Sequence, residues 1–226
     1  MLIQQKLPRR ILAVFSALVV LCLSACGAQP GATKVEGDGF ASPEKAAQAY
    51  IEGLRAADLP RMMSAFSVET YVDNYDFQAY LDWVGTYMSC QEIKLPNANG
   101  LATELNRESR RNTVSSTILR QYLFLCYPEL DQSAVTTLAD DTTPEAFTAQ
   151  LSGQLNAMQL ESAKLLGFIP PEELSELYAD EQNQENMKAR AAIYGANKTE
   201  SCAAVVELNG AKYILCMDVA DYGGKW

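Results

Sequence analysis

The chain has 226 residues, of which 48% are hydrophobic, so a single domain can bury a substantial core. Its formal net charge is −10 at pH 7. An acidic surface repels nucleic acid phosphates, so no nucleic-acid-binding role is expected. The chain contains no histidine, which excludes Ser-His-Asp and Cys-His nucleophiles and H-E-x-x-H zinc sites. It also lacks the G-x-S-x-G, Walker A and G-x-G-x-x-G motifs.

An export signal is predicted at the N-terminus. The first ten residues carry three positive charges and no acid, and the apolar run 11–23 follows. This run has 13 residues, fewer than the roughly 20 that a spanning helix needs. It ends in Leu23, Ser24, Ala25 and Cys26. The alternatives are a transmembrane anchor and a secretory signal that is cut elsewhere.

These features resemble the signal of bacterial lipoproteins, whose lipobox is Leu, a small residue, Ala or Gly, and Cys. The resemblance implies that the Cys26 thiol is joined to a diacylglycerol and that the bond after Ala25 is cut. Two acyl chains, at about 0.8 kcal/mol per buried methylene, anchor a protein firmly. We therefore expect a lipid anchor in the bilayer, on the extracytoplasmic face of a bacterial cell membrane. Without residues 1–25 and their three positive charges, the net charge becomes −13.

The rest of the chain is predicted to be a flexible tether and one domain. Residues 27–40 are small, polar and glycine-rich, so residues 26–40 are interpreted as a spacer. Residues 41–226 are predicted to form a single helix-rich α+β domain. Its C-terminal end is expected to be an antiparallel hairpin within a short curved sheet.

Capping residues mark the predicted helix starts. Ser42-Pro43-Glu44 and Thr143-Pro144-Glu145 each combine a hydroxyl cap, a proline in the first turn and an acid, and Asp58 is expected to cap a second short helix. Further helices are predicted from Phe77 to Met88, from Leu101 to Tyr127, and from Pro144 to Leu166. The buried side of the last of these is expected to be Phe147, Leu151, Leu155, Met158, Leu165 and Leu166. Residues 172–194 are predicted to form either one further helix or two helices with a polar joint near Asn183, closed by Gly195.

The only predicted β-structure is a hairpin with Asn209-Gly210 at its turn. A two-residue turn places Cys202 opposite Met217. A three-residue loop with Leu208 places Cys202 opposite Cys216, close to disulfide distance. We predict the three-residue loop and a Cys202–Cys216 bridge, which leaves Cys90 and Cys126 as the two cysteines that could form another pair. Four buried free thiols are the alternative.

A second resemblance concerns residues 42–66, SPEKAAQAYIEGLRAADLPRMMSAF. A capped helix followed by a short helix that starts at Ala57-Asp58-Leu59 is similar to the opening of the NTF2-like superfamily. That superfamily is a cone-shaped α+β fold, and the C-terminal hairpin suits its curved sheet. The resemblance implies that residues 101–194 form a helical insertion.

Three clusters of side chains are candidates for binding. Six aromatic residues at helical spacing could line a pocket or form core. Three arginines could bind an anion, although Glu104 and Glu108 are placed for helix-surface ion pairs. An acidic run lacks the Asp-x-Asp-x-Asp-Gly loop of calcium sites and fits a solvated helix face. These sets are Tyr71, Tyr75, Phe77, Tyr80, Trp83 and Tyr87; Arg107, Arg110 and Arg111; and Glu172, Glu173, Glu176, Asp180, Glu181 and Glu185.

No motif marks a catalytic residue, a cofactor site or a metal site. We therefore expect a non-catalytic, membrane-anchored extracytoplasmic domain that binds a small molecule, a wall fragment or a partner protein. The alternative is a histidine-free enzyme with an Asp or Glu base and a Tyr donor, which the NTF2-like resemblance allows.

Overall fold

The computed structural model describes residues 34–85, 94–127 and 141–226, and residues 35–226 form one compact unit. The predicted signal, its cleavage after Ala25, the lipidation of Cys26, and Cys90 lie outside the described residues and stay predictions. Within the described ranges, no helix has both the length and the apolar character needed to cross a bilayer.

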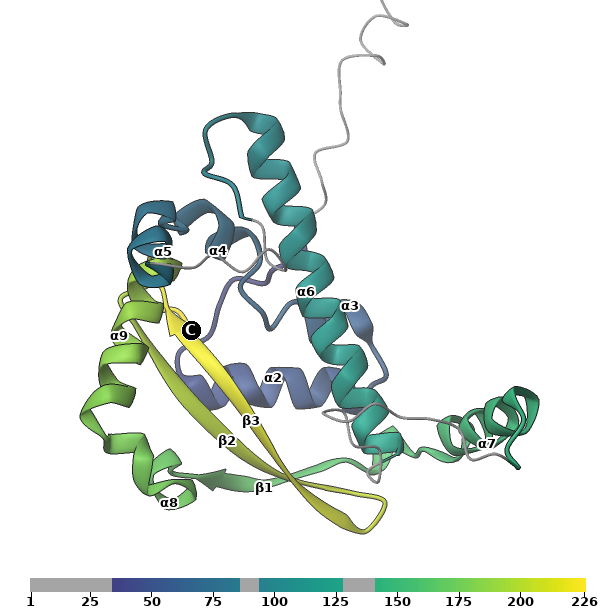
Figure 1. Ribbon diagram of the computed structural model, residues 1–226. Helices are drawn as coiled ribbons and strands as arrows, with labels where there is room; N and C mark the ends of the chain where they lie inside the picture. Colours follow the sequence, from purple (N-terminus) through teal and green to yellow (C-terminus); the bar gives the residue numbers. More distant parts are fainter. Residues whose placement is uncertain (1–33, 86–93, 128–140) are drawn as a thin grey trace, which may run out of the picture. The chain divides into compact units, whose positions relative to one another are not determined.

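The domain is mostly helical and has a small antiparallel sheet whose three strands lie in the C-terminal part of the chain, with helices between the first strand and the second, so the predicted α+β class is confirmed (Figure 1). The sheet has the strand order β1-β2-β3. In chain order the elements are α2 (Pro43–Arg55), α3 (Leu59–Met63), α4 (Glu69–Asn74), α5 (Phe77–Val84), α6 (Gly100–Cys126), α7 (Pro144–Ala157), η1 (Leu160–Ser162), β1 (Lys164–Ile169), α8 (Pro171–Leu174), η2 (Glu176–Ala179), α9 (Glu181–Tyr194), β2 (Lys198–Leu208) and β3 (Ala211–Asp221).

The predicted helix caps are confirmed. Ser42 Oγ accepts a hydrogen bond from the Lys45 amide at 3.3 Å. Asp58 Oδ1 accepts one from the Arg61 amide at 3.0 Å. Each bond satisfies an amide that the first helical turn leaves without a partner. The caps therefore fix where α2 and α3 begin.

The predicted helix through Leu165 and Leu166 is wrong in its second half. α7 ends at Ala157, has no buried residue, and is followed by strand β1, which contains both leucines. A short apolar run fits a strand as well as a helix, and here pairing of Leu165 with Val206 decides for the strand.

The predicted helix from Glu172 to Tyr194 is divided into three short elements. The longest of them, α9, begins after Asp180, whose side chain accepts a hydrogen bond from the Gln182 amide. The segment is therefore interrupted at Ser175 and at Asp180, and Asn183 lies inside α9. Gly195 closes α9 in the left-handed conformation, as predicted.

The hairpin has a two-residue turn, so the predicted three-residue loop is wrong. Asn209 and Gly210 have φ values of 51° and 78°, and Leu208 pairs with Ala211. Positive φ at both central residues is the type I′ geometry that Asn-Gly favours because its twist matches that of the strands.

This register also overturns the predicted Cys202–Cys216 bridge. Cys202 pairs with Met217 and Ala203 with Cys216, and successive residues of a strand face opposite sides of the sheet. The two thiols therefore lie on opposite faces, Cys202 buried and Cys216 exposed, and both are free, as is Cys126. Burial raises the pKa of Cys202 to about 11.

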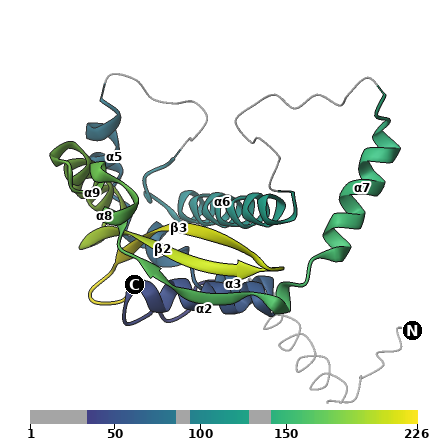
Figure 2. The ribbon, with the colours of Figure 1, turned by 90° about the horizontal axis from the view of Figure 1, so that it is seen from below.

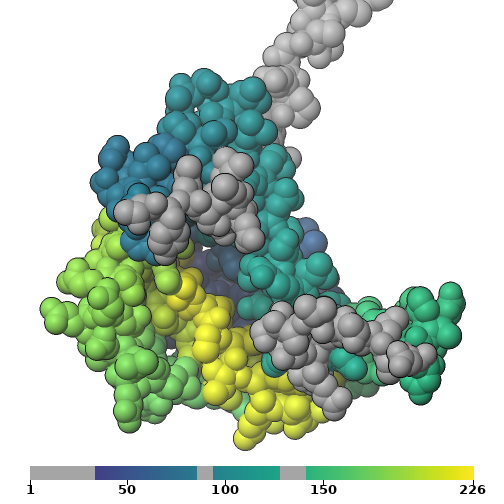
Figure 3. Space-filling view, in the orientation of Figure 1, coloured from purple at the N-terminus to yellow at the C-terminus, as the bar shows by residue number. Residues whose placement is uncertain are grey.

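The core lies on one face of the sheet. Ala204, Val206 and Leu208 of β2 point toward α2, where Ile51 and Leu54 are almost completely buried. Figure 2 shows α2 along this face. Val114 and Ile118 of α6 join the same cluster. On the opposite face of the sheet, Ile214 and Cys216 of β3 are exposed. In Figure 3 the surface of β3, in yellow, lies next to the green segment that carries α8 and α9.

The domain begins earlier than predicted, because residues 35–40 are not a free spacer. The Gly37 amide donates to Ser64 O at 3.0 Å. Phe40 and Trp226 exchange backbone hydrogen bonds of 2.7 and 2.9 Å. Small polar residues are typical of linkers, but here their backbone groups find partners on the domain. The expected tether to residue 40 is therefore too long.

Candidate functional site

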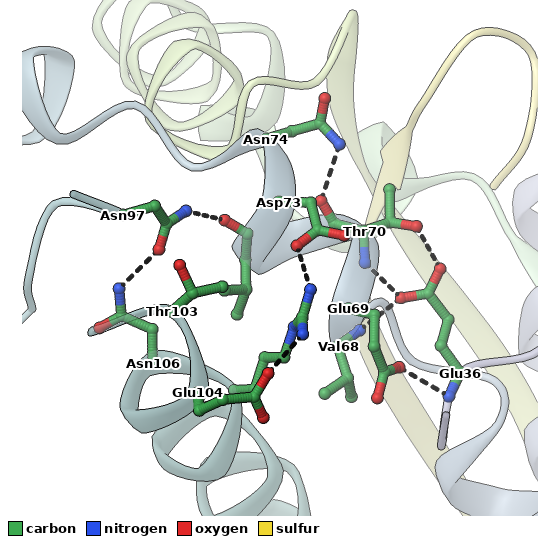
Figure 4. A network of polar contacts seen from close by, with 12 residues as sticks. Glu36, Val68, Glu69, Thr70, Asp73, Asn74, Asn97, Thr103, Glu104 and Asn106 are labelled. Atoms are coloured by element: carbon green, nitrogen blue, oxygen red, sulfur yellow. Dashed lines mark hydrogen bonds and ion pairs between the residues drawn. The ribbon is translucent and has the colours of Figure 1, made fainter. Parts of the chain in front are cut away.

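A carboxylate clamp fixes the start of the domain to α4 (Figure 4). The Glu36 carboxylate accepts hydrogen bonds from the Val68 and Thr70 amides, each at 2.8 Å, and a further one from the Thr70 hydroxyl. It thus occupies the N-terminus of α4, where backbone amides have no helical partner and negative charge is favourable.

Glu69 completes the clamp from the other side. Its carboxylate accepts hydrogen bonds from the Val35 amide at 3.1 Å, the Glu36 amide at 3.0 Å and Arg111 at 3.0 Å. Burial raises the pKa of Glu69, but the bonds from these two amides and from Arg111 outweigh it, so the pKa lies below its usual value. The charged groups of the clamp therefore have a structural role.

Two arginines of the predicted anion-binding cluster are engaged by acids. Arg107 contacts Asp73 at 2.7 Å and Glu104 at 2.6 Å. Arg111 contacts Glu108 at 2.6 Å in addition to Glu69. The two helix-surface pairs are those expected from the spacing. Hydrogen bonds to the acids raise the pKa of both arginines.

Arg110 has a different environment. Its guanidinium carbon lies 4.2 Å from the centre of the Tyr71 ring, and Nε donates to Ser67 O at 3.1 Å. The ion pairs of the described residues do not include it. A guanidinium on a tyrosine face is attracted by the electrons of the ring. Through Arg110, the predicted arginine cluster therefore contacts the predicted aromatic group.

Four of the six predicted aromatic residues come together beside α4 and α5. The ring centres of Tyr71 and Tyr75 are 5.8 Å apart, those of Tyr75 and Tyr80 6.1 Å, and those of Phe77 and Tyr80 6.2 Å. Trp83 is 62% exposed, and Tyr87 lies outside the described residues. The spacing predicted either core or a pocket, and the group has features of both. Tyr71 and Tyr80 are buried, as core residues are, and the group also surrounds a cation.

That cation is the ammonium group of Lys94. Its Nζ lies 5.8, 5.3 and 5.4 Å from the ring centres of Tyr71, Tyr75 and Tyr80, and donates to the Tyr71 hydroxyl at 3.0 Å. Each such ring contributes about 0.5–1 kcal/mol at an exposed site and more when water is excluded. We call Tyr71, Tyr75 and Tyr80 the tyrosine cage.

Two tyrosines from the C-terminal part of the chain extend this aromatic group. The rings of Tyr71 and Tyr194 lie 5.0 Å apart, and the Tyr222 hydroxyl donates to Tyr194 O at 3.2 Å. Burial raises the pKa of both Tyr194 and Tyr222, so both hydroxyls keep their protons at neutral pH. Sequence reasoning missed Lys94, Tyr194 and Tyr222, because no local pattern connects them with α4.

A groove of about 490 Å³ lies between α9 and the start of β2. This volume is within the roughly 300–1,000 Å³ of small-molecule sites. Alanine and methionine side chains contribute its apolar surface, and amide and charged groups its polar surface. The lining residues are Tyr178, Gln184, Met187, Lys188, Ala191, Ala192, Ala196, Asn197, Lys198, Thr199 and Glu200. No sequence motif pointed to it.

Several contacts hold the walls of the groove in place. Thr199 Oγ1 donates to Met187 O at 3.0 Å, which ties β2 to α9. Lys198 contacts Glu200 at 2.5 Å, and its Nζ lies 4.8 Å from the centre of the Trp226 ring. Of these contacts, the Thr199–Met187 hydrogen bond is the one that joins the two walls of the groove, a helix and a strand.

The acidic candidates do not converge on an ion. Asp180 caps α9, and Glu185 pairs with Lys188 at 2.6 Å. The described part of the chain contains no group of three or more acidic or cysteine side chains placed to hold a metal. The solvated-face interpretation of the run therefore agrees with its contacts.

Comparison with known proteins gives no relative: no protein-family model, curated protein or solved structure matches the chain significantly.

Proposed function

We propose that this protein is a lipid-anchored protein of the extracytoplasmic face of a bacterial membrane, and that its domain binds a small polar molecule or wall fragment without catalysis. The lipobox ending in Cys26 supports the anchor. The groove between α9 and β2 is the single observation that supports the binding role.

The groove suits a ligand that is partly apolar and partly polar. Ala191, Ala192 and Met187 offer an apolar surface, while Asn197 and the Lys198–Glu200 pair offer hydrogen-bonding groups. Small side chains leave room for the body of a ligand, and convergent polar groups fix its orientation. Sugars and short peptides of the cell wall have this mixed character.

The histidine-free enzyme is the second candidate. It requires a carboxylate near a tyrosine hydroxyl. Tyr50 instead donates to Gln121 Oε1 at 2.5 Å, and Tyr222 donates to a backbone carbonyl. The groove therefore supports binding better than the described tyrosine contacts support proton transfer. The NTF2-like resemblance stays a prediction.

A thermal-shift screen of wall saccharides, muropeptides and small polar molecules tests the binding role. A ligand that binds the folded state raises the melting temperature. Ala192→Trp should abolish this shift, because Ala192 is exposed and lines the groove. Ala149→Trp is the matched control, since Ala149 is exposed on α7. A shift that survives Ala192→Trp would contradict the assignment of the groove.

The anchor has its own test. Cys26→Ser should prevent both acylation and the normal cleavage, so mass spectrometry of the membrane fraction should find no lipid-modified mature chain. A wild-type protein whose mature form starts elsewhere and carries no lipid would contradict the anchor, whatever the outcome of the ligand screen.

A further inference from the structure

We infer that the groove between α9 and β2 binds a short extended peptide, which pairs with the free edge of β2 as an added strand. The inference rests on the proposed function, because it names the class of ligand for the same groove. It follows from where β1 ends, from the direction of the backbone groups of β2, and from the residues that line the groove.

β1 covers only part of the edge of β2. The last pair between the two strands joins Ile169 to Ala203, and Pro170 and Pro171 follow. Proline has no N–H, so the chain stops pairing there and turns into α8. Within the described ranges, residues 198–202 of β2 therefore have β3 on one side and no strand on the other.

The backbone of Thr199 faces this free edge. Leu208 and Ala211 flank the two-residue turn, so their backbone groups point toward each other, and every second residue of β2 repeats this direction toward β3. Thr199 falls between those residues, so its N–H and C=O point away from β3. No hydrogen bond of the described residues joins these two groups to α8, η2 or α9. They can therefore pair with an added strand.

The groove lies beside this edge and not over one face of the sheet. Lys198 and Glu200 project to the face that carries the core, whereas Thr199 projects to the opposite face, where its hydroxyl donates to Met187 O. All three residues line the groove. A space lined by three consecutive residues of a strand borders its backbone, here on the side away from β3. Figure 1 shows α9 alongside this part of β2.

The walls of the groove suit the alternating side chains of a strand. A peptide residue opposite Thr199 would point toward α9, where Met187 and Ala191 offer an apolar surface. Its two neighbours would point to the side of the Lys198–Glu200 ion pair, which suits small polar residues. In strand addition, backbone hydrogen bonds supply affinity and such side-chain surfaces supply specificity. This arrangement favours the peptide part of a wall fragment over its sugars.

Titration of the isotopically labelled intact protein, followed by NMR, tests the inference. The probes are acetylated, amidated pentapeptides Ser-Thr-X-Thr-Ser, in which X is alanine, valine or leucine. At least one should bind saturably and shift the amide proton of Thr199 downfield. N-methylation of X removes the donor that faces β2 and should weaken binding about tenfold, while N-methylation of the next threonine, whose N–H faces away, should weaken it less than about twofold.

The matched groove variants serve as controls. Ala192→Trp should abolish peptide binding because Ala192 lines the groove, and Ala149→Trp should leave it unchanged. The inference is overturned if none of the three peptides binds saturably, if both N-methylated peptides lose affinity equally, or if Ala192→Trp still binds peptide. A wall saccharide that binds the groove where no peptide does would overturn this inference and leave the proposed function standing. Failure of every saccharide, small polar molecule and peptide would overturn both.

Discussion

α2 and α7 have nearly the same start in sequence and very different surroundings in the fold. Each begins with a hydroxyl cap, a proline and a glutamate, at Ser42 and at Thr143. Six residues of α2 are buried, whereas none of α7 is. The comparison shows that capping determines where a helix starts, while its contribution to stability depends on what it packs against.

The largest difference is expected for leucines on the two helices. Leu54→Ala should lower the free energy of unfolding by about 2–5 kcal/mol, because Leu54 is 2% exposed and its loss leaves a cavity in the core. Leu155→Ala on α7 should lower it by less than about 1 kcal/mol. Urea unfolding measures both. Equal effects would mean that α7 is part of the same core.

Alkaline pH should reveal the burial of α2 through Tyr50. Burial raises the pKa of Tyr50 to about 12. The folded state therefore retains this proton where the unfolded chain loses it, and stability falls as pH rises from about 10 to about 12. A shift of this size corresponds to roughly 2–3 kcal/mol. Tyr50→Phe should reduce the fall in stability across this range, and an unchanged pH profile would contradict the burial of Tyr50.

Replacing a glycine by alanine should destabilise α2 and stabilise α7. A Cβ at Gly53 would lie 2.8 Å from Met62 N, so Gly53→Ala forces α2 and α3 apart and should destabilise by about 1–3 kcal/mol. A Cβ at Gly153 would meet no atom within 4 Å. Gly153→Ala should stabilise the helical conformation of α7 by about 0.5–1 kcal/mol and so raise its helicity. Chemical denaturation and circular dichroism follow the two effects.

The smallest difference concerns the caps. Ser42→Ala should cost about 1 kcal/mol in global stability, because an amide in the first turn of α2 loses its acceptor. Thr143→Ala removes the same kind of bond from α7, but should change global unfolding by less than about 0.5 kcal/mol. A denaturant melt of each variant decides. An unchanged melt for Ser42→Ala would contradict its role as a cap.

Local signals in the sequence predicted a large part of the fold. Ser42, Asp58 and Thr143 marked helix starts, and Gly195 marked a helix end, because the physical reasons for these positions lie within a few residues. β1 was mistaken for helix because an apolar pair such as Leu165-Leu166 suits either structure. Its pairing with β2 is a tertiary contact.

The sites were less predictable than the elements. The aromatic group around Tyr71 was a candidate from its spacing, but Lys94 and Tyr194 reach it from other segments. The groove depends on α9 lying against β2, and its alanines give no chemical signal. The predicted Cys202–Cys216 bridge is wrong because the turn is one residue shorter than predicted. A change of one residue in the turn shifts the register and changes which side of the sheet each side chain faces.

Hydrogen–deuterium exchange of the intact mature protein, with and without a wall fragment from the screen, tests the central claim most directly. Without ligand, amides of α2 should exchange slowly and those of α7 rapidly. With ligand, exchange should slow in residues 184–200, which line the groove, and stay unchanged in α7. Bound ligand that protects α7 or leaves residues 184–200 unprotected would contradict the assignment of the groove as the binding site.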